Sequence, residues 1–255
     1  APKLLNRLFA AREDQMFPLL ATLTKHLMQK NMLMFMNNDE EQSKIDRFGW
    51  AGSIAPSSRD YLSVVHTNIA GGPTDRMIDQ FLRYDVQAKD DGTLEAALTI
   101  ERIHRGDPSD PEFGTKNMDY VRVYVPEGSA LLSAEGFEQP GQGAFLNPDQ
   151  GYGADEDLEA LESRPTIDGP SQTRIFTSFG KTVFANWLPV EAGTSATATL
   201  RYRLPFRLKV GGFWDRSDRY QLLVQKQAGA QPTAIDVSIR LPSNLNVLAF
   251  APEGW

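Results

Sequence analysis

The segment from Asp60 to Gln80, DYLSVVHTNIAGGPTDRMIDQ, holds several side-chain types that acid–base or nucleophilic chemistry uses. Ser63 and His66 would form a nucleophile and its general base if their side chains came within hydrogen-bond reach. We expect residues 60–69 to form a β-strand, and successive side chains of a strand point to opposite faces of the sheet. Ser63 and His66 then lie on opposite faces and cannot pair. We therefore assign no catalytic residue here, and His66 stays only a candidate binding residue, with a hydrogen bond to a neighbour on its sheet face as the simpler interpretation.

The AGGPTDR sequence that follows predicts a turn leading into a helix. Gly71 and Gly72 can adopt positive φ, and Pro73 fixes the next turn. Thr74 can cap the helix through its hydroxyl, and Asp75 suits the first helical turn. An anion could bind at such an N-terminus, but the sequence has neither GxxxxGK[ST] nor GxGxxG. A turn with a helix cap is therefore favoured over a phosphate site.

An acidic segment, residues 147–168, is the main candidate for a metal site. It places acids and amides at alternate positions, as calcium loops do, but a count from Asn147 puts Gly151 and Leu158 where an EF-hand needs ligands. We keep Asp149, Asp155 and Asp157 as candidate calcium ligands, with a solvated acidic loop as the favoured interpretation. No other cofactor is expected, because the three histidines are far apart and the chain has no cysteine. The segment has one basic residue, Arg164. Its acids are Asp149, Asp155, Glu156, Asp157, Glu159, Glu162 and Asp168.

A basic and aromatic run lies near residues 201–220. Arg201 and Arg203 share the outward face of a predicted strand, where they could meet an anionic surface polymer or the chain's own acidic loop, or simply be solvated. Gly211-Gly212 suggests a hairpin tip that carries Phe213 and Trp214. Such a tip could contact a partner or fold back onto its own domain. We take these four side chains, with His66, as the candidate binding residues.

The elements that must position these residues change character along the chain. Residues 3–30 have helical periodicity divided by Pro18, residues 31–38 form a short apolar run typical of a strand, and residues 39–49 suit a helix ending at Gly49. Beyond residue 80 the period becomes two, with a strong hairpin signal at Asp91-Gly92 and a possible short helix at 155–163. We therefore predict an α+β fold. A mixed helix and strand part at 1–80, the remainder of a larger α/β unit, precedes an antiparallel, immunoglobulin-like β-sandwich at 81–255, with an acidic Gly/Pro-rich insertion at 137–172.

Composition limits the setting of the protein. The 255 residues carry a net charge of −7, which disfavours nucleic acid as a partner. No stretch approaches the roughly 20 apolar residues that span a bilayer, and no signal peptide is visible. The chain starts with APKLLNRLFA, without Met, so we expect it to be a fragment of a longer protein.

Several ordered blocks resemble one known family. They include HLMQKNMLMFMNNDEEQSKIDRFGWAGSI, the 60–80 segment, NMDYVRVYVPEGSALLSAEGF, GKTVFANWLPVEAGTSATATLRYRLP and YQLLVQKQAG. Together they resemble the C-terminal part of the bacterial DUF4012 family, from about residue 20 to about residue 240. The resemblance implies an extracellular, cell-surface protein anchored by an N-terminal transmembrane helix that this chain lacks. The family has no established activity and so supplies no catalytic residues, and its preceding segment rich in Asn, Arg and Gly is also missing here.

We accordingly expect a non-catalytic surface module that binds a protein partner or a cell-envelope polymer, or acts as a spacer. One alternative is an envelope enzyme acting on a polysaccharide or phosphate-linked polymer, with a cleft that gathers His66 with Asp75 or Asp79. The other alternative is a calcium-stabilised adhesin.

Overall fold

The computed structural model describes residues 12–69, 72–141, 143–145, 153, 155–161, 165–210, 217–231 and 233–251. The chain divides into two compact units. The first comprises Ala1–Ile54, Lys226–Ala230 and Ala251–Trp255, and the second comprises Ala55–Gln225 and Gln231–Phe250.

The described part of the first unit contains two helices, α2 (Glu13–Met28) and α3 (Asp39–Arg47). Pro18 lies inside α2, so the expected division of this region at the proline is wrong. The Asn38 side chain caps α3 by accepting the N–H groups of Glu40 and Glu41, and Gly49 follows with a φ of +69°. None of the helices in the described part of the chain is long and apolar enough to span a membrane.

The strand expected at residues 31–38 is absent from the structure, which describes this whole segment. The Met34 N–H donates to the Trp50 carbonyl, and the Met36 N–H donates to the Gln42 side chain at 2.8 Å. The apolar run therefore meets helix α3 and the chain after it, and these isolated contacts replace a sheet ladder.

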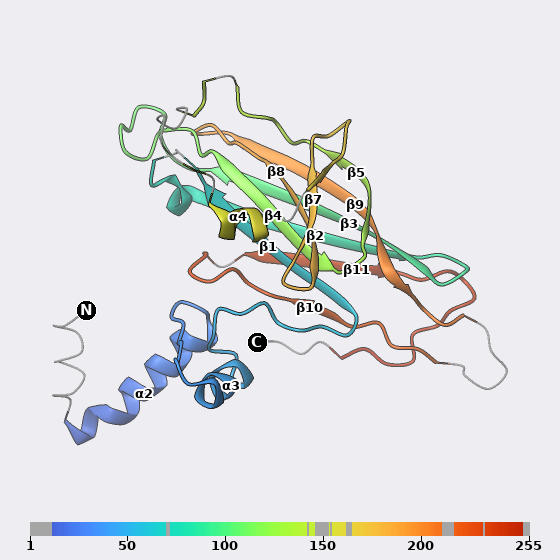
Figure 1. The fold of residues 1–255 in the computed structure, drawn as a ribbon, viewed down its shortest axis with the longest axis horizontal. Coiled ribbons are helices and arrows are strands. Elements are labelled where there is room, and N and C mark those ends of the chain that lie inside the picture. The colour runs from blue at the N-terminus through green and yellow to red at the C-terminus, as the bar shows by residue number, and fades with distance from the viewer. Residues whose placement is uncertain are drawn as a thin grey trace. The chain divides into compact units, whose positions relative to one another are not determined.

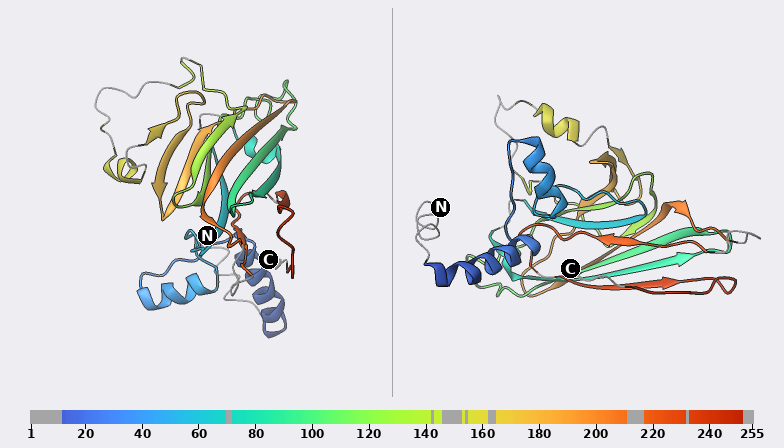
Figure 2. Two further views of the ribbon diagram at one scale, coloured as in Figure 1. Left: turned by 90° about the vertical axis from the view of Figure 1, so that its right-hand side faces the viewer. Right: turned by 90° about the horizontal axis from the view of Figure 1, so that it is seen from below.

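The second unit consists of two sheets packed face to face (Figures 1 and 2). The six-stranded sheet has the order β10-β1-β4-β8-β7-β6, and the five-stranded sheet has the order β11-β2-β3-β9-β5. Among its described residues this unit also has two short helices, the 3-10 helix η1 (Thr74–Met77) and α4 (Glu156–Leu161). The strands are β1 (Asp60–Asn68), β2 (Ile78–Ala88), β3 (Thr93–His104), β4 (Asp119–Pro126), β5 (Ala130–Glu135), β6 (Thr166–Ile167), β7 (Arg174–Ser178), β8 (Lys181–Trp187), β9 (Ser195–Arg207), β10 (Leu222–Val224) and β11 (Ala234–Arg240).

The strand pairing confirms a predominantly β structure with the architecture of a sandwich, and changes one detail. Neighbouring strands are antiparallel except at one edge of each sheet, where β10 joins β1 and β11 joins β2 in parallel. The sandwich is therefore mixed at its edges. The expected hairpin is confirmed between β2 and β3, where Gly92 has a φ of +80° and Asp91 accepts the Thr93 N–H.

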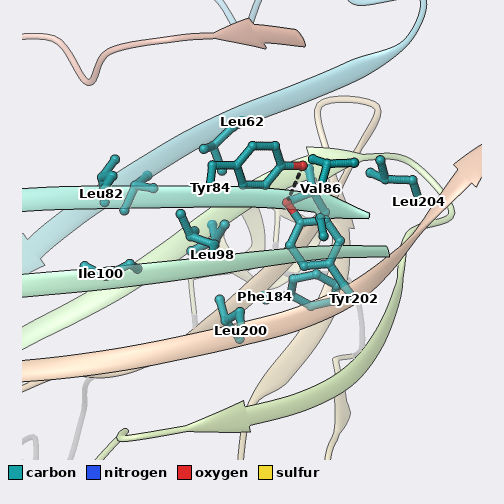
Figure 3. Packing of buried hydrophobic residues seen from close by; sticks show 14 of the residues in the cluster. Leu62, Leu82, Tyr84, Val86, Leu98, Ile100, Phe184, Leu200, Tyr202 and Leu204 are labelled. Atoms are coloured by element: carbon teal, nitrogen blue, oxygen red, sulfur yellow. Dashed lines mark hydrogen bonds between the residues drawn. The ribbon is translucent and has the colours of Figure 1, made fainter. Parts of the chain in front are cut away.

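Alternating side chains of the strands form the core between the sheets (Figure 3). On β3 the even-numbered side chains are buried and most odd-numbered ones are partly exposed, which is the expected pattern for a half-buried strand. Tyr84 and Tyr202 meet in the core through their hydroxyl groups, 3.1 Å apart. Phe184 packs against the Tyr202 ring at a centroid distance of 5.5 Å.

The boundary expected at residue 80 lies elsewhere in the structure, between Ile54 and Ala55. Strand β1 lies within the six-stranded sheet, between β10 and β4. Its neighbours come from residues 222–224 and 119–126, so the local pattern around residue 60 does not reveal where this strand belongs. The acidic insertion carries α4 near its predicted position and also a two-residue strand, β6, that was not predicted.

Candidate functional site

His66 is held by a buried carboxylate on the neighbouring strand. The pairing of β1 with β4 places Ser63 opposite Tyr124 and His66 opposite Val121, which confirms that Ser63 and His66 point to opposite faces. The His66 Nδ1 lies 2.6 Å from Oδ2 of Asp119, whose side chain is fully buried. In many hydrolases a carboxylate on Nδ1 orients a histidine as a general base. The geometry therefore makes this the first place to look for chemistry.

The same carboxylate also binds a cation from the opposite sheet. Arg102 of β3 donates from Nη1 to Asp119 Oδ2 at 2.7 Å and to Asn117 Oδ1 at 3.0 Å. Asn117 in turn donates to Thr74 Oγ1 at 3.0 Å and to Asp75 Oδ1 at 2.8 Å. Burial lowers the pKa of Arg102, and the Asp119 charge opposes that effect.

We call His66, Arg102, Asn117 and Asp119 the Asp119 cluster. The second carboxylate oxygen of Asp119 accepts the Thr67 N–H at 3.0 Å, so both oxygens are engaged. The cluster thus ties β1, β3, β4 and the turn before β2 to one another.

The turn after β1 differs from its prediction. It forms the 3-10 helix η1 of four residues, and its N-cap residue is Pro73, with no side-chain cap. The Thr74 hydroxyl accepts the side-chain N–H groups of Asn68 and Asn117, so the expected helix cap by Thr74 is wrong. Asp79 pairs with Arg105, so it does not join His66 in one site. Gly71 lies outside the described residues.

His104 holds the loop that follows β3. Its Nδ1 accepts the Gly106 N–H at 3.0 Å, and its Nε2 lies 3.1 Å from the Thr115 carbonyl oxygen. One ring nitrogen accepts and the other must donate, which describes a neutral imidazole. A Cβ atom on Gly106 would lie only 2.6 Å from the His104 ring, so the close approach requires glycine. This histidine has a structural role.

A second buried carboxylate, Asp60 at the start of β1, joins the two sheets and was not identified from the sequence. Asp60 Oδ1 accepts the Tyr61 N–H at 2.8 Å. Its Oδ2 accepts the hydroxyls of Tyr84 at 2.8 Å and of Tyr220, and Tyr84 accepts the Tyr202 hydroxyl. Burial raises the pKa of Asp60 to about 6, although these hydrogen bonds oppose the rise. We call Asp60, Tyr84, Tyr202 and Tyr220 the Asp60 cluster.

Outward strand positions on the six-stranded sheet carry several cations. Arg122 of β4 and Arg174 of β7 flank Ala185 of β8 in one cross-strand row. Arg122 donates from Nη2 to Thr67 Oγ1 at 3.0 Å, and its Nε is buried without an acceptor among the described residues. Outward positions of β1, β4, β7 and β8 hold one further cation, Lys181, and no Asp or Glu.

Aromatic rings lie in the next row of the same face. Tyr120 and Trp187 are cross-strand neighbours with ring centroids 4.9 Å apart, and Phe145 packs on Trp187 at 5.1 Å. All three rings are partly exposed. We call Tyr120, Arg122, Phe145, Arg174 and Trp187 the arginine–aromatic face. The strand alternation on which it depends was visible in the sequence, but the order of the strands was not.

The predicted Arg201 and Arg203 lie exposed on the outer face of the five-stranded sheet, and they share one face of β9 as expected. Their cross-strand neighbours on β3 are Ala97 and Glu95. Acidic and basic side chains alternate on this face, so a solvated polar surface explains it. The predicted Phe213 and Trp214 lie outside the described residues.

Of the candidate calcium ligands, Asp149 lies outside the described residues. Asp155 and Asp157 are exposed, and Asp155 accepts the Asp157 N–H at 3.0 Å at the start of α4. Such a bond is typical of a carboxylate that caps a helix. Within the described ranges, no three His, Asp or Glu side chains are grouped closely enough to hold a metal ion.

Comparison with known proteins adds no relative, since no protein-family model matches this chain and no curated protein matches it either.

Proposed function

We propose that the protein is a non-catalytic surface module of the bacterial envelope and that its β-sandwich binds an anionic envelope polymer. The observation that carries the non-catalytic part is the Asp119 cluster. The carboxylate of a general-base histidine stabilises the imidazolium that forms, whereas the charge of Asp119 is already paired with the buried guanidinium of Arg102. The same cluster fixes two sheets and a turn, which is a role in the stability of the sandwich.

The arginine–aromatic face supports the binding part of the proposal. A guanidinium offers a planar fork of donors that matches a carboxylate or phosphate group, and Arg122 and Arg174 lie on either side of Ala185 on this face. Aromatic rings beside it offer apolar surface to the carbon skeleton of a sugar or glycerol unit. Because the whole chain has a charge of −7, the lack of Asp and Glu at the outward positions of β1, β4, β7 and β8 is a local feature of these strands.

The proposed setting is the outer face of the cell membrane, with anchoring by an N-terminal transmembrane segment beyond this sequence. The support for this is the resemblance of the sequence blocks to DUF4012. We also propose that the sandwich is of the immunoglobulin-like kind, which two packed, largely antiparallel sheets support.

Binding to poly(glycerol phosphate) tests the proposal, with dextran as an uncharged control. We expect calorimetry to show that the whole chain binds poly(glycerol phosphate). The length of the polymer should stay unchanged after long incubation with the protein. Arg122→Gln should weaken binding by about tenfold or more, as expected for loss of a charge-assisted hydrogen bond. Arg201→Gln, on the opposite sheet, should have little effect.

Two results would contradict the proposal. Equal affinity for poly(glycerol phosphate) and dextran would show that binding does not depend on anionic groups. Shortening of poly(glycerol phosphate) would show catalysis. His66→Gln identifies the second case, because it should then stop the shortening while binding persists.

A further inference from the structure

Strand β11 ends the five-stranded sheet with an open edge. It pairs with β2 over its whole length, from Ala234 opposite Phe81 to Arg240 opposite Gln87, and with no other strand that the structure describes. It lies at the margin of the sheet in Figure 1. An exposed edge of this length offers unpaired backbone donors and acceptors to another strand.

The side chains of β11 that face inward are also uncovered. Val237 and Ile239 are 41% and 38% exposed, whereas their neighbours Tyr84 and Val86 on β2 are 0% and 1% exposed. Half-exposed β-branched residues on an edge strand indicate a surface that another apolar strand could cover.

The sequence of β11 is complementary to itself in one antiparallel register. A two-fold axis through Ser238 places Asp236 opposite Arg240 of a second copy and Val237 opposite Ile239 of that copy. Opposite charges in directly facing positions stabilise an antiparallel pair, and like charges destabilise it. A two-fold axis through Asp236 or Arg240 would place that residue opposite the same residue of the second copy, and so bring like charges together. An axis through Val237 would leave the charges of Asp236 and Arg240 unpaired.

Intrachain contacts leave these two charges available. Asp236 lies 3.9 Å from Arg83, and Arg240 lies 3.9 Å from Asp85. The Asp236 and Arg240 side chains are 76% and 75% exposed, so both ion pairs are solvated and weak. In the two-fold arrangement Asp236 would lie between Arg83 of its own chain and Arg240 of the second copy.

We infer that two copies of this chain join through β11, antiparallel about Ser238, so that one sheet continues through both copies. The interface is isologous and closed, as expected for a symmetric dimer. This inference does not depend on the proposed polymer binding. If the protein both dimerises and binds the polymer, the dimer carries two arginine–aromatic faces and binds a long polymer more tightly than one copy does.

Sedimentation equilibrium of the whole chain over a wide concentration range tests this inference. The expected result is a transition from 28.4 kDa to twice that mass. Asp236→Arg and Arg240→Asp should each weaken dimerisation by at least tenfold, because each places like charges opposite each other. The double variant Asp236→Arg/Arg240→Asp should restore the dimer.

Arg201→Asp is the matched control, because it reverses an exposed charge on the outer face of β9, away from the β11 edge, and it should leave the dimer intact. A monomer at all concentrations would overturn the inference. So would a dimer that tolerates both single reversals, or one that the double variant fails to restore. Circular dichroism of each variant separates a lost interface from a lost fold.

Discussion

Replacement of Asp60 by asparagine measures how much the ionisation of a carboxylate buried between two sheets changes the free energy of unfolding. Asp60 is fully buried, and burial raises its pKa from 3.8 to about 6. Each pKa unit is worth about 1.4 kcal/mol, so suppression of the charge amounts to about 3 kcal/mol. The folded state binds the proton more tightly than the unfolded state over this range.

The sign of the pH dependence follows from that difference. At pH 3 and below the carboxyl is almost wholly protonated in both states, and its contribution to stability is fully present. As the pH rises from 3.8 through 6, the unfolded state ionises first, and that contribution is lost. The free energy of unfolding of the wild type should therefore fall by about 3 kcal/mol relative to Asp60→Asn between pH 3 and 7. Asparagine preserves the shape of the neutral acid and does not titrate.

Urea unfolding followed by tryptophan fluorescence at intervals of pH gives both profiles. Asp107→Asn is a useful control because the Ser109 backbone N–H and hydroxyl lower the pKa of the exposed Asp107. Its contribution is present above its unfolded pKa and is lost as the pH falls, which is the opposite sign. Parallel profiles for the wild type and Asp60→Asn would refute the reasoning, since they would show that the buried acid ionises as readily as a free one.

Two further stability changes follow from the packing. Arg102→Met should lower the free energy of unfolding by about 3–5 kcal/mol in urea titrations at pH 7, because it leaves Asp119 charged and buried; a loss under 1 kcal/mol would show that the pair is solvated. Gly92→Ala should lower the free energy of unfolding by roughly 3 kcal/mol or more, because the new Cβ would lie 2.0 Å from the Leu208 carbonyl oxygen at a φ of +80°. Gly180 has a φ of +66° with open space around it, so Gly180→Ala should lower the same free energy by only about 1–2 kcal/mol. Equal costs would mean that the hairpin rearranges.

Local patterns predicted the elements of the sandwich well. Alternation on β3 and β9 and the turn chemistry at Asp91-Gly92 depend only on neighbouring residues, and the structure agrees with both. The separation of Ser63 from His66 onto opposite faces likewise follows from strand geometry. By contrast, the apolar run at 31–38 satisfies the composition of a strand, but it has no partner strand among the described residues, and composition does not report that.

Long-range pairing limits what sequence can say about the candidate site. Tyr220 reaches Asp60 across 160 residues, and Asp119 reaches His66 across 53 residues. Which acid meets which partner depends on the order of strands in each sheet. The parallel edge strands β10 and β11 show that this order is not the sequential one.

The two buried carboxylate clusters also explain how β1 keeps its register between the sheets. Asp60 and His66 stand near the two ends of β1 on its inward face, with Leu62 and Val64 between them. The Asp60 cluster reaches β2, and the Asp119 cluster, through Arg102, reaches β3 of the opposite sheet. A shift of β1 by one residue would turn all its side chains to the other face, so that Tyr84 would lose its acceptor Asp60 and Asp119 would lose His66. An apolar core would tolerate such shifts at a smaller cost, because one aliphatic side chain can replace another. The buried polar residues of the two clusters thus define a single alignment of β1 against both sheets.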